Sequence, residues 1–295
     1  MFTDFSHHSS APAADDWTVP ERWEAFTPED HRVWDLLFAR QQARLAGRVV
    51  REFEQGLDVL RLSHPGIPRL AELNERLEPR TGWTIVPVPG LVPDDIFFGH
   101  LSRRRFPAGN FIRSAAQLDY LEEPDIFHDV FGHVPMLAQP RVADFMQALG
   151  EEGLNAIAAG AGHRLARLYW YTIEFGLARE AGELRIYGAG LASSFGEAAY
   201  SLESGAPRRL PFDLHRVLRT RYRPDAFQPC YFVIDSFDEL LGQLGMIDLR
   251  GLYGELDDEA DLDPATGQAC LSLETALPPP PPSLSPPQMR EGGCR

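Results

Sequence analysis

Cysteine is scarce in this 295-residue chain, because only Cys230, Cys270 and Cys294 occur and no two of them have C-x-x-C spacing. A disulfide scaffold and a cysteine-ligated zinc site are therefore disfavoured. The chain also lacks an apolar run of the roughly 18 to 20 residues that a membrane-spanning helix needs. Residues 1–16 lack the basic start and apolar core of a secretory signal. We therefore expect a cytoplasmic protein that has no membrane partner.

Basic residues are in the minority, with 28 Lys and Arg against 43 Asp and Glu, which gives a net charge of −15. A field of that sign repels phosphate backbones and anionic lipids, so nucleic acid is not expected as a partner. The sequence also has no internal repeat, no P-loop and no G-x-G-x-x-G segment following a strand. A nucleotide-dependent enzyme is disfavoured for that reason.

The composition divides the chain into one domain and two tails. Residues 1–16 are rich in Ser, Ala, Asp and His without any periodicity, so they are expected to be disordered. Residues 17–255 carry the apolar periodicity of a single folded domain. Residues 256–295 are acidic, contain the proline run 278–282, and are also expected to be disordered. Their removal should therefore cost little stability.

Helical patterns dominate residues 17–255, so the predicted fold class is mainly α with a few short β-strands. Thr27-Pro28-Glu29-Asp30 predicts a helix start, because a hydroxyl cap precedes proline and acidic residues in the first turn. Apolar residues then recur at three- and four-residue steps to Phe53, and Gly47 is placed to divide this region. Further helices are expected at 67–77, 94–101, 142–158, 164–179, 193–202 and 236–244, and strands at 83–88, 183–187 and 230–234.

Two histidines, His128 and His133, lie five residues apart in the segment 123–135. A five-residue step on an α-helix turns through about 500°, which leaves the two imidazoles about 140° apart. Both rings reach one ion only if the backbone departs from the helix, and Gly132 and Pro135 are placed to permit that. The spacing differs from the H-E-x-x-H motif of zinc proteases, so a protease is disfavoured.

A lone carboxylate, Glu174, lies within the apolar and aromatic segment 169–177. An ionised group in such surroundings needs a cation. A salt bridge to Arg113 or Arg167 is one explanation, just as a structural role is one explanation of the histidine pair. Two imidazoles and one carboxylate also match the facial triad that holds non-haem iron(II).

Four ordered segments resemble the pterin-dependent aromatic amino acid hydroxylases. Residues 128–135 (HDVFGHVP) are similar to that family's H-[DE]-x-x-G-H-V-P segment, and residues 169–177 (YWYTIEFGL) to its Y-W-x-T-x-E-F-G-L segment. Residues 111–113 (FIR) and 187–197 (YGAGLASSFGE) agree in order and approximate spacing, and the resemblance spans roughly residues 17–249. It implies an aromatic amino acid hydroxylase-type catalytic domain in which His128, His133 and Glu174 bind iron and support catalysis.

The resemblance also implies two groups of binding residues around the metal. Arg113 falls at the position that binds the substrate carboxylate, with Asp125 placed to orient the guanidinium. The remaining substrate-binding positions are Pro124, Trp170, Phe175, Gly190, Ser193 and Val233. The pterin-binding positions are Gly90, Leu91, Val92, Phe97 as a stacking residue, and Asp129 and Tyr169 through water. Pro93 and Asp94 differ from the serines of mammalian members, and Leu121 and Glu122 differ from the hydroxyl residue and proline of animal members.

The implied activity is hydroxylation of an aromatic ring with Fe(II), a tetrahydropterin and dioxygen. L-Phenylalanine, converted to L-tyrosine, is the favoured substrate for two reasons. Val233 stands where tyrosine hydroxylases have aspartate, and Trp170 stands where tryptophan hydroxylases have phenylalanine. The proline-rich tail replaces the apolar heptad helix of tetrameric relatives, so we expect a monomer whose other partners are pterin-recycling enzymes, and those only indirectly.

Three alternatives stay open at this point. The first is a tryptophan hydroxylase of the same family. The second is a facial-triad oxygenase that uses 2-oxoglutarate, although such enzymes are built on a strand-rich barrel and this sequence has a helical pattern. The third is a non-catalytic, zinc-stabilised interaction protein, which needs a fourth protein ligand where the sequence offers three.

Overall fold

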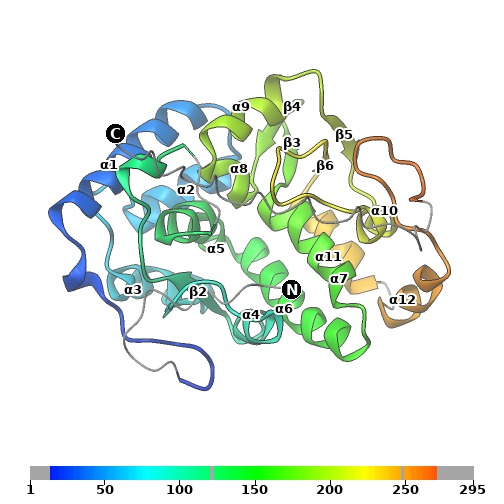
Figure 1. Ribbon diagram of the computed structural model, residues 1–295, viewed down its shortest axis with the longest axis horizontal. Helices are drawn as coiled ribbons and strands as arrows, with labels where there is room; N and C mark the ends of the chain where they lie inside the picture. The colour runs from blue at the N-terminus through cyan, green and yellow to red at the C-terminus, as the bar shows by residue number, and fades with distance from the viewer. Residues whose placement is uncertain (1–13, 120–122, 247–248, 271–295) are drawn as a thin grey trace, which may run out of the picture.

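The computed structural model describes residues 14–119, 123–246 and 249–270 (Figure 1). Most of these residues are helical, and the few strands are four or five residues long, which confirms the predicted fold class. The α-helices are α1 Pro28–Leu45, α2 Arg51–Leu60, α3 Leu70–Thr81, α4 Asp94–Leu101, α5 Val134–Leu137, α6 Pro140–Ala158, α7 Gly162–Tyr169, α8 Ala189–Ser193, α9 Phe195–Glu203, α10 Leu214–Arg219, α11 Phe237–Met246 and α12 Leu249–Asp257. Two 3-10 turns, η1 Trp23–Ala25 and η2 Ala115–Gln117, and two π-helical segments, η3 Phe127–His133 and η4 Trp170–Glu174, complete the helical part.

The strands form two small sheets that lie well apart, with helices between them (Figure 1). Strands β1 Thr84–Val88 and β2 Arg105–Gly109 pair in parallel. The second sheet has the order β4-β3-β6-β5 and contains β3 Leu177–Glu180, β4 Glu183–Ile186, β5 Arg208–Pro211 and β6 Cys230–Ile234. Strand β6 pairs in parallel with β3 and β5, and all five of its residues are buried. It is therefore, with β3, one of the two central strands of that sheet.

The start of the first long helix follows the local chemistry of its sequence. Thr27 and Asp30 form a reciprocal capping box, and Pro28 is the first residue of α1. Gly47 has φ +67°, a left-handed conformation that favours glycine, and it lies between α1 and α2. The expected division of this helical region at Gly47 is thereby confirmed.

An aromatic cluster fixes the π-helical segment that carries the two histidines. The rings of Phe127 and Phe131 stack with centroids 4.8 Å apart, and Trp34 from α1 packs edge-on against Phe127 at 5.2 Å. Phe53 from α2 packs edge-on against Phe131 at 5.8 Å. These four side chains are almost fully buried, so η3 is anchored by its apolar residues while its polar residues stay free to line a site.

One expectation about secondary structure is wrong, and two further strands were not expected. The helix predicted at 164–179 ends in the π-helical segment η4, because Leu177 and Ala178 pair with Val233 and Ile234 of β6. Sheet pairing across the fold overrides local periodicity there. Strands β2 and β5 were not predicted, since each contains proline and neither alternates polar with apolar residues.

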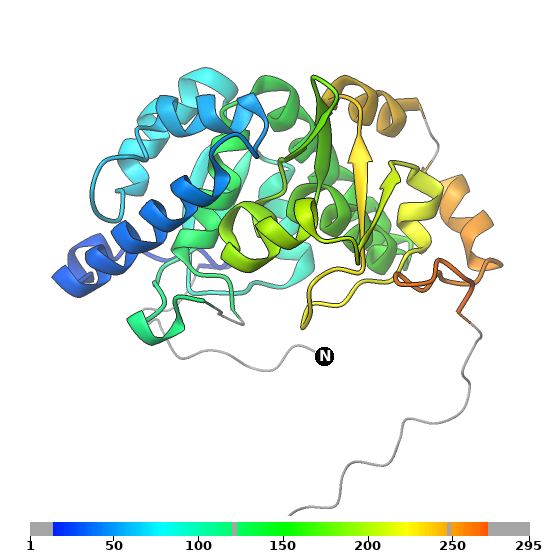
Figure 2. The same ribbon diagram turned by 90° about the horizontal axis from the view of Figure 1, so that it is seen from above.

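The folded chain continues beyond the predicted boundary at residue 255. Leu256 in α12 is fully buried, and Leu262 forms β-bridges with Thr220 and Ala269. The expected disorder of 256–295 therefore does not hold for residues 256–270, while 271–295 and 1–13 lie outside the described residues. Residues 258–270, called the brace below, lie beside α10 (orange in Figures 1 and 2).

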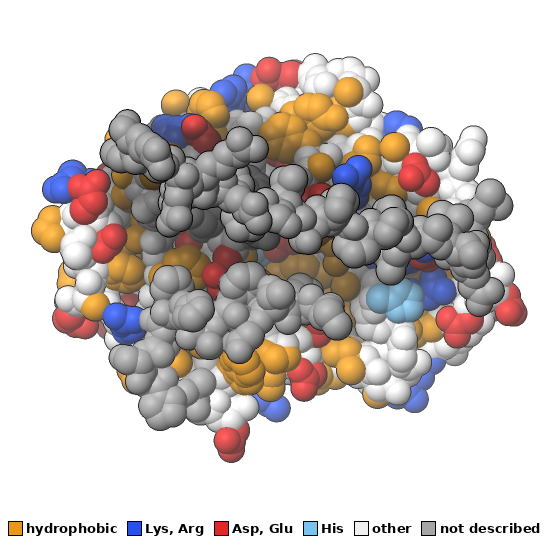
Figure 3. Space-filling model, in the orientation of Figure 1, with side chains coloured by type: hydrophobic (Ala, Val, Ile, Leu, Met, Phe, Trp, Pro, Cys, Tyr) orange, Lys and Arg blue, Asp and Glu red, His pale blue; other side chains and the backbone are white. Residues whose placement is uncertain are grey.

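The described ranges contain no helix with the length and apolarity that crossing a membrane requires. On the face drawn in Figure 3, acidic and basic side chains lie interspersed with apolar ones.

Candidate active site

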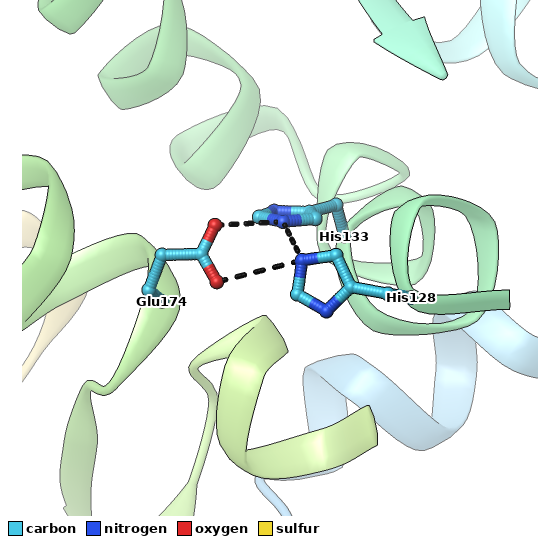
Figure 4. Close-up of side chains that lie close together, drawn as sticks. All are labelled: His128, His133 and Glu174. Atoms are coloured by element: carbon cyan, nitrogen blue, oxygen red, sulfur yellow. Dashed lines mark hydrogen bonds and ion pairs between the residues drawn. The ribbon is translucent and has the colours of Figure 1, made fainter. Parts of the chain in front are cut away.

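The side chains of His128, His133 and Glu174 converge from two separate helical segments (Figure 4). The two Nε2 atoms are 3.2 Å apart, His133 Nε2 lies 3.0 Å from Glu174 Oε1, and His128 Nε2 lies 3.6 Å from Oε2. Two atoms that bind one ion at about 2.1 Å and at right angles lie about 3.0 Å apart. The three donors are therefore spaced to hold a divalent metal ion on one side.

The π-helical winding of η3 explains how histidines five residues apart reach the same point. A π-helix closes hydrogen bonds between residues five apart, so His128 and His133 lie about one turn apart on the same face. The sequence predicted a departure from α-helix near the second histidine, whereas the altered winding spans all of Phe127–His133. Glu174 is likewise the last residue of a π-helical segment, η4.

Short helix α8 connects the two ligand-bearing segments through close backbone approaches. A Cβ atom on Gly132 would lie 3.0 Å from the carbonyl oxygen of Ala189, the first residue of α8. A Cβ atom on Gly190 would lie 3.0 Å from the carbonyl oxygen of Glu174 and 3.2 Å from its Oε2. Glycine at these two positions therefore lets η3, η4 and α8 meet without steric conflict.

Ser193 at the end of α8 determines which nitrogen of His128 faces Glu174. The Ser193 hydroxyl donates its only hydrogen to the Ala189 carbonyl at 2.9 Å, so its oxygen accepts from His128 Nδ1 at 2.8 Å. His128 Nε2 is then unprotonated and turned toward the other two donors, the state that metal binding requires. This hydrogen bond gives Ser193 a role in orienting a ligand.

Burial and mutual charge set the ionisation of this cluster. Burial lowers the pKa of His128 to about 4, although the Glu174 carboxylate opposes that change. Burial would raise the pKa of Glu174, but His133 and His128 outweigh it and hold the value at about 2. A neutral His128 imidazole and an ionised Glu174 carboxylate are ligand states that a metal site requires at neutral pH.

The cluster faces a cleft of about 1220 Å³ that most of the predicted site residues line. Those that line it are Leu91, Phe97, Arg113, Pro124, His128, Asp129, His133, Tyr169, Trp170, Glu174, Phe175, Gly190 and Ser193. Four predicted residues do not line it. Gly90 and Val92 flank Leu91 in the loop before α4, Asp125 is buried beside Arg113, and Val233 lies in β6 between Leu177 and Pro211. Val233 is therefore not among the residues that line the cleft.

Arg113 is held in the cleft wall by a buried ion pair. Its Nε and Nη2 atoms donate to the two carboxylate oxygens of Asp125, each at 2.8 Å, and Asp125 is fully buried. Asp125 also accepts from the Arg113 backbone N–H at 2.9 Å and the His128 backbone N–H at 3.1 Å. One edge of the guanidinium is thus engaged, and the Nη1–Nη2 edge is left for a second anion.

Aromatic side chains from α4 and α7 meet on another part of the cleft. The rings of Phe97 and Tyr169 pack edge-on with centroids 5.3 Å apart. Nearby, Asp129 accepts a hydrogen bond of 2.7 Å from the Gly109 backbone N–H, and burial raises its pKa to about 7. Glu123, which the sequence did not single out, accepts from the Leu91 backbone N–H at 3.4 Å. This hydrogen bond connects the loop before α4 to Glu123, which also lines the cleft.

Sequence reasoning also missed the outer wall of the cleft, residues 222–228. The ring of Tyr222 stacks on Trp170 with centroids 4.3 Å apart and planes at 17°. Gln228 accepts from Trp170 Nε1 at 3.0 Å, and the Gln228 backbone N–H donates to Glu197 Oε1 at 2.8 Å. Glu197 is buried and also accepts from the Tyr231 hydroxyl. The feature of the sequence that could have indicated these contacts is Glu197, the only acidic residue of the segment 187–197.

Comparison with known proteins agrees with this fold and site. Residues 19–247 match the family described as biopterin-dependent aromatic amino acid hydroxylase. The chain therefore belongs to that family. Its dependence on iron(II) and a pterin is supported by this match as well as by the four motifs.

Several relatives are similar over most of their length. Phenylalanine-4-hydroxylase of Caulobacter vibrioides is 53% identical over 266 residues, which cover 89% of this chain and 90% of the relative. That of Ralstonia nicotianae is 56% identical over 225 residues, which cover 76% and 72%. A crystal structure of phenylalanine hydroxylase from Chromobacterium violaceum with iron and phenylalanine bound superposes with a TM-score of 0.81 at 46% identity, covering 85% of this chain and 91% of that one.

Proposed function

We propose that this chain is a phenylalanine 4-monooxygenase, which converts L-phenylalanine to L-tyrosine with a tetrahydropterin and dioxygen at iron(II) bound by His128, His133 and Glu174. The observation that carries the proposal is the convergence of these three ligands on a cleft that also presents Arg113. When bound, iron(II) and the pterin together supply the activation of dioxygen, and the protein positions the reactants.

Three protein ligands would leave coordination positions of a bound ion free. Among the described residues, only these three histidine, cysteine or acidic side chains form a cluster suited to a metal. A structural zinc site would close its coordination with a fourth protein ligand, whereas a catalytic site keeps positions free. The three-donor cluster therefore favours an enzyme over a zinc-stabilised interaction protein.

Arg113 supplies the recognition of an amino acid. Its engaged edge holds Asp125, and its second edge suits the two oxygens of the substrate carboxylate. Pro124, Trp170, Phe175, Gly190 and Ser193 line the same cleft and are proposed to surround the substrate. The rings of Trp170 and Phe175 lie 4.6 Å apart, so they offer an apolar surface for an aromatic side chain.

The pterin is proposed to occupy the part of the cleft near Phe97. The ring of Phe97 suits stacking on a bicyclic ring, and the loop containing Gly90, Leu91 and Val92 suits contact through backbone groups. Asp129 and Tyr169 line the same cleft and are proposed to hold the pterin through water. We propose further that the protein acts in the cytoplasm as a monomer, with its pterin regenerated by separate enzymes.

One assay tests the proposed function. The protein is loaded with iron(II) without oxygen, mixed with L-phenylalanine and a tetrahydropterin, and exposed to air, and tyrosine is measured. Tyrosine formation that requires both iron and pterin is expected. Faster hydroxylation of tryptophan than of phenylalanine would instead indicate a tryptophan hydroxylase, and metal binding without turnover of either would contradict an enzymatic role.

A further inference from the structure

The outer wall and helix α7 meet at an aromatic stack that borders the cleft. Trp170 follows directly after α7, and Tyr222 is the first residue of the outer wall. Their rings stack at 4.3 Å, and both residues line the cleft. The two residues are far apart in the sequence and come from different elements, so something must hold their backbones at this separation.

Asp261 in the brace binds the arginines that precede these two aromatic residues. Its Oδ1 accepts from Arg167 Nη1 at 2.7 Å, and its Oδ2 accepts from Arg167 Nη2 at 2.8 Å. Oδ2 also accepts from Arg221 Nε at 2.9 Å. Arg167 lies three residues before Trp170, and Arg221 lies directly before Tyr222. The Asp261 carboxylate therefore connects the segment that precedes Trp170 with the segment that precedes Tyr222.

Backbone hydrogen bonds join the brace to the start of the outer wall. The Arg221 N–H donates to the Leu262 carbonyl at 3.0 Å, and the Leu262 N–H donates to the Arg219 carbonyl at 2.8 Å. From the side of η4, the Tyr171 hydroxyl donates to the Arg221 carbonyl at 2.6 Å. The backbone at Arg221 is thus fixed from two directions.

The ion pair between Asp261 and Arg167 is largely shielded from solvent, so it can restrain the orientation of both side chains. The Arg167 side chain is 9% exposed and the Asp261 side chain 20% exposed, whereas Arg221 is 60% exposed. Burial would raise the pKa of Asp261, but hydrogen bonds from Arg167 and Arg221 outweigh it and lower the value to about 2. Bidentate pairing of this kind fixes orientation as well as distance.

We propose that Asp261 is a positioning residue for the substrate: it sets the Trp170–Tyr222 stack and, through that stack, the affinity for the aromatic ring. The proposal rests on the proposed function, because the stack borders the cleft assigned to phenylalanine. Neither Asp261 nor the brace lines the cleft, so the effect acts through Arg167 and Arg221.

The test compares Asp261→Asn with Asp258→Asn, a matched change of charge at an exposed carboxylate in the same segment. Asp261→Asn is expected to raise the KM for phenylalanine about three- to tenfold, as for other directly coupled side chains. The KM for the tetrahydropterin and the iron content should stay unchanged, because the contacts of Asp261 lead through Arg167 and Arg221 to the Trp170–Tyr222 stack. Asp258→Asn should match the unsubstituted protein. An unchanged phenylalanine KM in Asp261→Asn, or equal rises in both KM values, would overturn the proposal.

Exposed Arg221 gives a second test that spares the buried pair. Arg221→Gln should raise the phenylalanine KM in the same direction, and Arg221→Lys should restore part of the affinity because it keeps a cation beside Asp261. Near-ultraviolet circular dichroism reports on the Trp170–Tyr222 stack without turnover, and its aromatic signal should weaken in Asp261→Asn but not in Asp258→Asn. Absence of tyrosine formation by the unsubstituted protein would refute the proposed function only, and an unaltered signal in Asp261→Asn would refute the positioning role.

Discussion

The two sides of the cleft are built in different ways. The metal side consists of η3 and η4, where His128, His133 and Glu174 belong to continuous helical segments with a recognisable sequence pattern. The outer wall consists of residues 222–228, which have no regular secondary structure and are held by Trp170, Glu197 and the brace. Local winding positions the metal side, and contacts between distant segments position the outer wall.

This difference separates two kinds of function. A metal needs donors fixed within tenths of an ångström, which short helical segments anchored in an aromatic core provide. An aromatic substrate needs a shaped apolar surface, which tolerates support from a loop and a few ion pairs. Changes on the metal side should therefore abolish the reaction, and changes on the outer wall should alter affinity or stability.

The largest expected effect is the loss of a metal ligand. Replacing His128, His133 or Glu174 by alanine should reduce iron-dependent tyrosine formation by more than about 100-fold. Substituting a residue that only hydrogen-bonds to a metal ligand already lowers metal affinity or activity about 10- to 100-fold. Iron content after gel filtration and the rate of tyrosine formation are the measurements. His64→Ala, at an exposed histidine, should change neither. Near-full activity in a ligand variant would remove that residue from the site.

The next effect concerns the stability that the buried side of α12 contributes. Leu256→Ala removes a fully buried side chain from α12, so the free energy of unfolding should fall by about 2 to 5 kcal/mol. Leu154→Ala, at a side chain that is 37% exposed, should cost less than about 1 kcal/mol. Urea denaturation measures both. Equally small losses of unfolding free energy in the two variants would favour the domain boundary at residue 255 that the sequence predicted.

The sequence predicted much of the metal side and little of what supports the outer wall. The ligands, the helix-dominated fold class and strand β6 follow from short-range patterns: periodic apolar residues, the Thr27 cap and the paired histidines. The π-helical winding of η3 could not be predicted, because it results from packing of Phe127 and Phe131 against distant helices. From the sequence, a change in winding could be inferred only because two histidines five residues apart cannot reach one ion from a regular α-helix.

The brace was missed because its composition suggests disorder. Residues 256–270 are acidic and contain few apolar side chains, yet Asp261 and Leu262 are held by Arg167, Arg221 and Thr220. Low hydrophobicity predicts disorder only when no other segment supplies partners. The role of Val233 stays a prediction, since its backbone pairs with Leu177 and Pro211 inside a sheet and the residue is not among those that line the cleft. Pairings between distant segments are not visible in either local sequence.

A smaller effect is expected for recognition of the substrate carboxylate. Arg113→Lys keeps a cation beside Asp125 but loses the planar edge that suits a second carboxylate. The KM for phenylalanine should rise about tenfold, which corresponds to about 1.4 kcal/mol. Arg141→Lys, in an exposed ion pair with Asp238, should leave the KM unchanged. An unchanged KM in Arg113→Lys would place the substrate carboxylate elsewhere.

The last effect is a pH-dependent change in stability, and it concerns Glu197, which holds the outer wall through Gln228. Burial raises the pKa of Glu197 to about 7, against the hydrogen bonds from the Gln228 N–H and the Tyr231 hydroxyl. The unfolded carboxyl titrates near its ordinary value of 4.5, so between about pH 4.5 and 7 the folded protein binds more protons than the unfolded chain. This group therefore makes the protein less stable as the pH rises through that window. Glu197→Gln keeps an acceptor oxygen for both donors and removes the titration. Its free energy of unfolding, measured from pH 5 to 7, should exceed that of the unsubstituted protein by an amount that grows with pH. Glu54→Gln, at an exposed position on α2, should show no such trend. Parallel curves for Glu197→Gln and the unsubstituted protein would mean that Glu197 ionises in the folded state as readily as in the unfolded chain, and that its hold on Gln228 costs no stability at neutral pH.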